Sequence, residues 1–129
     1  MKKIISLIIS FIIIDLSFSL IAAENSSKNF ADNKIITVDD EPRDADFTSI
    51  KEALNYLSPG DTIEVYSGFY PEQGIHILND NITLLGISHE LGEGDDVGKP
   101  FIKGNGSESV IYVEASLVIV SNLIIENSE

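Results

Sequence analysis

Cysteine is absent from this 129-residue chain, and basic residues are scarce. The lack of cysteine excludes disulfides, thiolate metal sites and lipid attachment through a cysteine behind an export signal. Lysine and arginine number 8 against 21 aspartate and glutamate residues, a formal net charge of -13. Nucleic-acid binding requires a basic surface, so we expect no nucleic-acid partner. The acidity suits a solvated extracellular surface, and divalent cations are the alternative explanation.

Common catalytic signatures are also missing. The sequence contains no G-x-S-x-G, no P-loop and no H-E-x-x-H motif. His76 lies between two apolar residues of inward type and should face outward, while His89 belongs to a loop, so we do not expect them to form a pair. We assign no catalytic, cofactor-binding or metal-binding residue from the sequence.

The N-terminus has the three parts of a secretory signal. Lys2 and Lys3 precede the apolar run "IISLIISFIII", and a second run, "LSFSLIAA", follows Asp15 and ends in small residues. We predict a signal peptide over residues 1–23, a flexible polar leader over 24–34, and a secreted, cell-surface or periplasmic protein that does not remain in the membrane. A membrane anchor is the alternative, but a carboxylate near the bilayer centre costs about 2.5–3.5 kcal/mol.

One helix is predicted after the first strand, "IITVDD". Ser49 and Glu52 fit a capping box, and "SPGD" ends the helix after about ten residues, because Pro59 cannot continue it and Gly60 permits a turn. A helix this short must dock its apolar face. That face consists of Phe47, Ile50, Ala53, Leu54 and Leu57.

From Asp61 onward the apolar residues alternate with period two, which predicts short strands. The segment Gly74–Ile87 repeats as Val110–Leu123 at an offset of 36 residues, so that Ile75 meets Ile111 and Leu84 meets Val120. Such self-similarity predicts a solenoid in which each coil stacks on the next. Three strand positions make one coil, and residues 88–100 form an acidic, glycine-rich insertion. The helix would then cover the open edge of the first coil.

The stretches "ITVDD", "DFTSIKEALNYLSPGDTIEVYSGFYPE", "NITLLGIS" and "SVIYVEASLVIVSNLIIENS" resemble the N-terminal part of pectin lyase-like proteins. The resemblance implies an all-β solenoid, a right-handed parallel β-helix with an N-terminal capping α-helix and about two to three coils, over residues 35–129. Pectinesterases share the helix pattern at Asp46, Phe47 and Ile50 and the turn pattern at Gly68 to Glu72. Exported surface repeat proteins, adhesin-like proteins and periplasmic proteins of copper-site maturation form the second branch, which the last repeat resembles more.

The catalytic carboxylates, glutamines and arginine of pectinesterases lie on later coils, and no residue of this chain matches them. Because about two or three coils are present and Glu129 follows a strand-like segment, we expect a truncated or fragmentary β-helix. Missing C-terminal coils, or a homotypic stack through the open end, would then be its partners.

Two acidic clusters and three tyrosines are the remaining site candidates. Calcium takes six to eight oxygen ligands, but the spacing of the first cluster fits no EF-hand, and the glycines of the second indicate a mobile loop and not a preformed cage. A solvated surface is the simpler interpretation. We expect Tyr70 to pack inside and Tyr66 and Tyr112 to face outward, where rings can stack on saccharides. The acidic clusters are Asp39, Asp40, Glu41, Asp44 and Asp46, with Arg43 as a local ion-pair partner, and Glu90, Glu93, Asp95 and Asp96.

We therefore predict an exported β-helix module of a cell-surface, adhesin-like protein that binds a polysaccharide or cell-surface glycan. The alternative is the N-terminal fragment of a pectinesterase-like or polysaccharide-lyase-like enzyme. An enzyme of that kind needs paired carboxylates on adjacent coils. The outward positions His76, Thr83, Tyr112 and Ile119 include none, which favours the binding module.

Overall fold

The computed structural model describes residues 32–42 and 44–128. The predicted signal peptide, most of the leader and Arg43 lie outside the described residues. Within the described ranges, no helix has the length and apolar character needed to cross a bilayer. The elements are β1 (Ile35–Val38), α2 (Ile50–Leu54), β2 (Thr62–Val65), β3 (Phe69–Tyr70), β4 (Ile75–Ile77), β5 (Thr83–Gly86), β6 (Phe101–Gly104), β7 (Ile111–Val113), β8 (Ile119–Ser121) and β9 (Ile124–Asn127).

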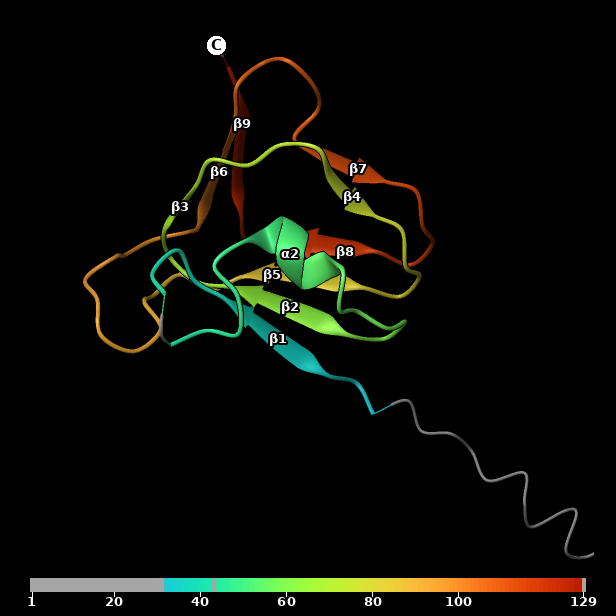
Figure 1. Cartoon of the computed structure of the whole chain (residues 1–129), viewed down its shortest axis with the longest axis horizontal. Helices are drawn as coiled ribbons and strands as arrows, with labels where there is room; N and C mark the ends of the chain where they lie inside the picture. Colours follow the sequence, from blue (N-terminus) through green and yellow to red (C-terminus); the bar gives the residue numbers. More distant parts are fainter. Residues whose placement is uncertain (1–31, 43, 129) are drawn as a thin grey trace, which may run out of the picture. The chain divides into compact units, whose positions relative to one another are not determined.

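The strands form three sheets, ordered β1-β2-β5-β8, β3-β6-β9 and β4-β7. Every pairing within them is parallel. The chain visits the sheets in turn, so β2, β3 and β4 form one layer, β5, β6 and β7 form the next, and β8 and β9 form a third. Figure 1 shows the three sheets around a common interior, with α2 lying over it. The described fold is thus mostly β, with parallel sheets throughout.

The predicted repeat register is confirmed. Ile75 pairs with Ile111 in the β4-β7 sheet, and Leu84 pairs with Val120 in the β5-β8 pair. In the remaining sheet Phe101 pairs with Ile124, a shorter separation in sequence, because the loop at residues 88–100 has no counterpart in the next layer. The insertion therefore leaves the stacking of the strands intact.

The alternating pattern places one side chain in two inside the stack. Ile36, Ile63 and Leu84 are successive partners in the first sheet and are fully buried. Tyr70 is buried as predicted, and its Oη donates a hydrogen bond to the carbonyl oxygen of Tyr66 at 2.9 Å. The other fully buried apolar side chains are Val38, Ile50, Ala53, Val65, Ile75, Ile77, Ile82 and Ile102.

Helix α2 is shorter than predicted: it spans five residues instead of about ten. Asn55 ends it: its side-chain nitrogen donates to the carbonyl oxygen of Lys51 at 3.2 Å, and the chain continues as turns. The Ser49 hydroxyl accepts from the Glu52 backbone nitrogen at 3.3 Å, which is one half of the predicted capping box, but the Glu52 side chain makes no return bond among the described residues. Ile50 and Ala53 are buried, which confirms the centre of the predicted apolar face.

A residue from the next layer completes the N-terminal cap of α2. The Glu72 carboxylate accepts hydrogen bonds from the backbone nitrogens of Ile50 at 2.9 Å and Lys51 at 3.0 Å. A carboxylate at a helix N-terminus satisfies free N–H groups and complements the helix dipole. Glu72 thereby links α2 to the segment between β3 and β4.

Candidate functional site

A groove runs along the outer side of the β3-β6 pair. Its volume is about 510 Å³, within the range of roughly 300–1,000 Å³ that small-ligand sites occupy. The Phe69 ring is 48% exposed at this groove and lies 5.6 Å from the Phe101 ring, centroid to centroid. The groove is lined by Phe69, Pro71, Glu72, Gln73, Lys103, Gly104, Asn105 and Ser128.

Backbone contacts fix the position of Phe69. Its backbone nitrogen donates to Asp40 Oδ2 at 2.8 Å. Asp40 can approach this closely because the preceding residue is Gly68, where a Cβ atom would collide with the Asp40 carboxylate. Since Tyr70 points inward, the pleat directs the neighbouring Phe69 outward. The exposed ring is therefore held by the fold.

Polar groups beside the ring are held by hydrogen bonds between the layers. Gln73 Oε1 accepts from the Asn105 backbone nitrogen at 2.8 Å, and Gln73 Nε2 donates to Ser107 Oγ at 2.8 Å. Lys103 Nζ lies 3.4 Å from Glu126 Oε1. An aromatic face next to oriented amide and ammonium groups can stack against one side of a ligand while donating hydrogen bonds to its edge.

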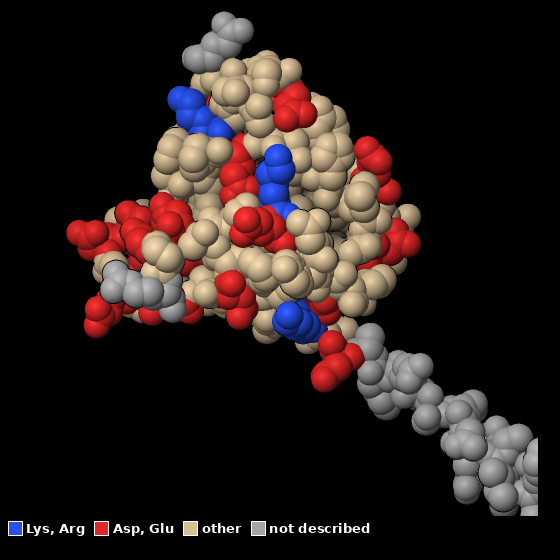
Figure 2. Space-filling view, in the orientation of Figure 1, with Lys and Arg blue, Asp and Glu red and all other residues tan. Residues whose placement is uncertain are grey.

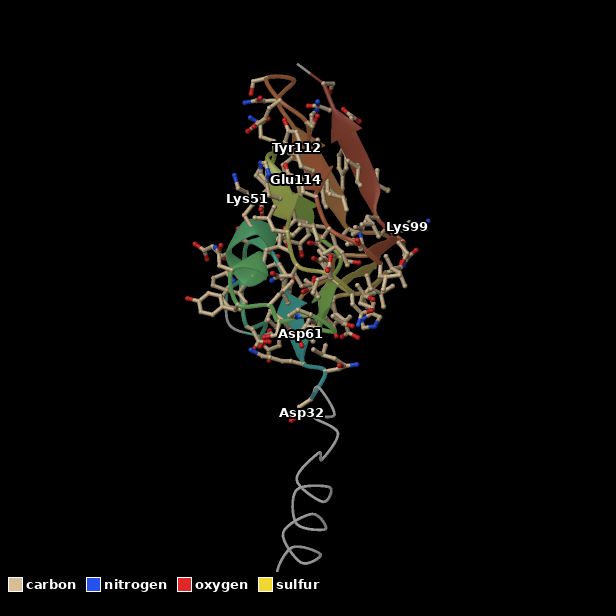
Figure 3. All side chains as sticks on the ribbon, turned by 90° about the vertical axis from the view of Figure 1, so that its right-hand side faces the viewer. Asp32, Lys51, Asp61, Lys99, Tyr112 and Glu114 are labelled. Atoms are coloured by element: carbon tan, nitrogen blue, oxygen red, sulfur yellow. The ribbon has the colours of Figure 1, made fainter. Side chains whose placement is uncertain are left out.

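A second aromatic pair lies on the outer side of β4 and β7. The rings of His76 and Tyr112 are stacked at 4.5 Å with 14° between their planes, and Glu114 Oε1 lies 3.8 Å from His76 Nδ1. Figure 3 shows Tyr112 and Glu114 above Lys51, with Lys99 at the opposite edge. A separate groove of about 410 Å³ between α2 and β4 includes His76, Lys51 and Asn79 in its lining.

The predicted tyrosines do not share one surface. Tyr112 is half-buried on β7, whereas Tyr66 follows β2 and packs edge-on against His89 at 5.5 Å. Burial, together with a hydrogen bond from Tyr66 Oη to Glu64 Oε2 at 3.1 Å, raises the pKa of Tyr66. The two histidines likewise have different aromatic neighbours. Phe69 and Phe101 were not predicted as outward rings, although an inward Tyr70 implies an outward Phe69 on the same strand.

The structure brings parts of the two predicted acidic clusters together. Three carboxylate oxygens lie within 4.8 Å of one another, one each from Glu41, Glu90 and Asp96. The same holds for Asp39, Asp40 and Glu41. Figure 2 shows acidic side chains gathered at the left side of the molecule, where Figure 1 shows the insertion loop. The expected ion pair of Arg43 falls outside the described residues.

Asp44 and Asp46, two other members of the first acidic cluster, accept hydrogen bonds from nearby backbone groups. Asp46 Oδ2 accepts from the backbone nitrogen and the hydroxyl of Thr37, both at 3.0 Å, and these bonds lower the pKa of Asp46. Asp44 Oδ2 accepts from the Glu93 backbone nitrogen at 3.2 Å. Asp44 thereby links the β1–α2 connection to the insertion loop.

Comparisons with protein-family models, curated proteins and solved structures give no match.

Proposed function

We propose that residues 35–129 form the first coils of a right-handed parallel β-helix of pectin lyase-like type, with α2 as the cap of the first coil. Three features support this fold. The sheets are parallel and are visited in a repeating order, the repeat register is 36 residues for two strand positions, and α2 buries Ile50 and Ala53 over the interior.

We propose that this β-helix is an exported, cell-surface module that binds a polysaccharide in the groove at Phe69. The exposed Phe69 ring beside the fixed Gln73 side chain is the observation that carries the proposal. A sugar ring presents an apolar C–H face, which stacks on an aromatic ring, and hydroxyl groups at its edge, which pair with amides. Pairing of the layers continues the groove wall from β3 to β6, which suits an elongated polymer.

The enzymatic alternative has less support among the described residues. His76 and Glu114 form the clearest acid–base pair on the outer surface, but both side chains are about half exposed or more. Tuning a general acid or base normally requires burial or a strong charged neighbour. An assay for methanol release from methylated pectin tests this alternative directly, and we expect none.

The binding proposal is tested by affinity electrophoresis and calorimetry of the full chain against a panel of plant and microbial polysaccharides. We expect Phe69→Ala to weaken binding of the selected polysaccharide about tenfold, a loss of roughly 1.4 kcal/mol. Tyr112→Ala is the matched control, since it removes a ring from the other outer surface and should leave affinity unchanged. Absence of binding by the wild-type chain, or loss with Tyr112→Ala alone, contradicts the proposed groove.

A further inference from the structure

A cluster of carboxylates joins the end of β1 to the insertion loop. Asp39, Asp40 and Glu41 follow β1 directly, while Glu90 and Asp96 come from the loop at residues 88–100. Glu41 belongs to both groups of carboxylates whose oxygens lie within 4.8 Å of one another. The cluster therefore connects two segments that are far apart in the sequence. None of its carboxylates lines the Phe69 groove, although Asp40 accepts a hydrogen bond from the Phe69 backbone nitrogen.

Asp39 is the most unusual member of this cluster. Its side chain is fully buried, and neither carboxylate oxygen has a hydrogen-bond partner. Asp40 uses one oxygen to accept from Phe69, and Glu90 uses one to accept from the Leu91 backbone nitrogen at 3.2 Å, but the other oxygen of each is buried without a partner. Buried carboxylate oxygens without donors are strongly unfavourable, so something must compensate them.

Neutralisation by basic side chains does not provide that compensation in the described part of the chain. Its Lys and His residues form ion pairs only with Glu114 and Glu126, which lie elsewhere. Burial and, to a smaller extent, the neighbouring Glu90, Glu41 and Asp40 together raise the pKa of Asp39 to about 7. Repulsion from Asp40 raises the pKa of Glu41, and burial raises that of Asp96.

Among the described residues nothing else compensates these charges, which leaves a proton or a cation. A proton shared between Asp39 and Glu90 would neutralise one of the five charges and leave four negative charges repelling one another. A divalent cation would attract all of them at once. Oxygens on opposite sides of a Ca²⁺ ion are at most about 5 Å apart, since each lies roughly 2.3–2.6 Å from the metal. Within each group of three carboxylates, the oxygens lie within 4.8 Å of one another, which is inside this limit.

We propose that Asp39, Asp40, Glu41, Glu90 and Asp96 form a Ca²⁺ site that fastens the insertion loop to the first turn of the chain. Carboxylate oxygens are hard ligands, which favours Ca²⁺ or Mg²⁺ over metals that prefer sulfur or imidazole. Ca²⁺ tolerates irregular geometry and several carboxylates, whereas Mg²⁺ requires a near-ideal octahedron and retains water. A site shared by a strand end and a glycine-rich loop therefore suits Ca²⁺ better.

The first test uses the full chain, stripped with EGTA and dialysed. Calorimetric titration with CaCl₂ should show saturable binding that is tighter than binding of MgCl₂. Ca²⁺ at about 100 times its dissociation constant should raise the unfolding temperature by roughly 10 °C, because the ion binds only the folded state. A melting temperature that is the same in EGTA and in millimolar CaCl₂ would overturn the site and indicate the shared proton.

The second test uses matched pairs of loop variants. Glu90→Gln and Asp96→Asn each remove a proposed ligand and should weaken Ca²⁺ binding at least tenfold. Glu93→Gln and Asp95→Asn remove the same charge from the same loop, outside the cluster, and should bind Ca²⁺ as the wild type does. Equal weakening by all four variants would indicate diffuse attraction to an acidic surface and would overturn the proposal.

The third test separates a cation ligand from a merely structural residue. Asp39→Asn removes a buried charge, so it should raise the melting temperature of the EGTA-treated protein while abolishing the increase produced by Ca²⁺. A variant that melts lower than wild type in EGTA and retains the Ca²⁺-dependent increase would contradict the assignment of Asp39 as a ligand.

Discussion

The two ends of the strand stack have the same inward pattern but different burial. At the end that carries α2, Ile36, Ile63 and Leu84 are fully buried, whereas Val120, the next partner in the same column, is 38% exposed. The other two sheets show the same contrast. Ile102 is buried while its partner Ile125 is 46% exposed, and Ile77 is buried while its partner Val113 is 49% exposed.

This contrast shows that the pattern of a strand determines which way a side chain points, while the neighbouring layer determines how far it is buried. At the first end, α2 provides the neighbour and is held in place by Glu72. At the last strand of each sheet, β8, β9 or β7, the inward side chains have a paired strand on one side only among the described residues. The energetic value of each inward residue should therefore depend on its layer.

The largest expected difference is between two truncations in one column. Leu84→Ala leaves a cavity between two layers and should lower the free energy of unfolding by about 2–5 kcal/mol. Val120→Ala removes a partly exposed side chain and should cost less than about 1 kcal/mol. Urea unfolding followed by circular dichroism measures both, and equal costs would mean that the two layers are equally enclosed.

The second prediction concerns pH and the end that carries α2. The folded-state pKa of Asp39 is raised from 3.8 to about 7, so the fold favours the protonated acid. Without divalent cations, the contribution of Asp39 to the free energy of unfolding should be greatest below pH 4 and should fall as the pH rises from 4 to 7. Asp39→Asn should flatten this decline, which urea unfolding in EGTA at a series of pH values would detect. An unchanged slope in the variant would assign the decline to other groups.

The third prediction concerns the hydrogen bonds that hold α2 in place. Glu72→Gln weakens the charge-assisted hydrogen bonds to the first turn of α2 and should cost about 1 kcal/mol. Glu52→Gln is the control, because the Glu52 side chain makes no hydrogen bond or ion pair among the described residues while its charge lies on the same helix. If both variants unfold at the same urea concentration as wild type, the hydrogen bonds between Glu72 and α2 contribute nothing to the free energy of unfolding.

The smallest effect on stability is expected at the exposed layer. Ile125→Lys should change the free energy of unfolding by no more than about 0.5 kcal/mol. We expect the exposed apolar layer to promote self-association, which the added charge should reduce. Sedimentation velocity over a range of concentrations tests this, with Tyr56→Lys, an exposed position on the other end, as the control. Self-association that only Tyr56→Lys reduces would place the contact at the helix.

Period-two alternation was sufficient to predict the inward columns and the register of the repeat, because each buried residue recurs at a fixed separation. The length of α2 was not predictable, since Asn55 ends the helix through a side-chain contact and Glu72 caps it from another layer. The proximity of Glu41 to Glu90 was also not predictable, because the insertion loop has no periodicity that would indicate where it folds back.

The most direct test of the stacked register is a disulfide between two layers, which the absence of native cysteine makes unambiguous. Paired strands lie about 4.7–4.9 Å apart, within the roughly 4.4–6.8 Å between Cα atoms that a disulfide allows. His76→Cys combined with Tyr112→Cys should oxidise readily into an intramolecular disulfide with the fold retained, while His76→Cys with Val113→Cys should not. Cross-linking of the second pair in preference to the first would contradict the stacked arrangement on which the account depends.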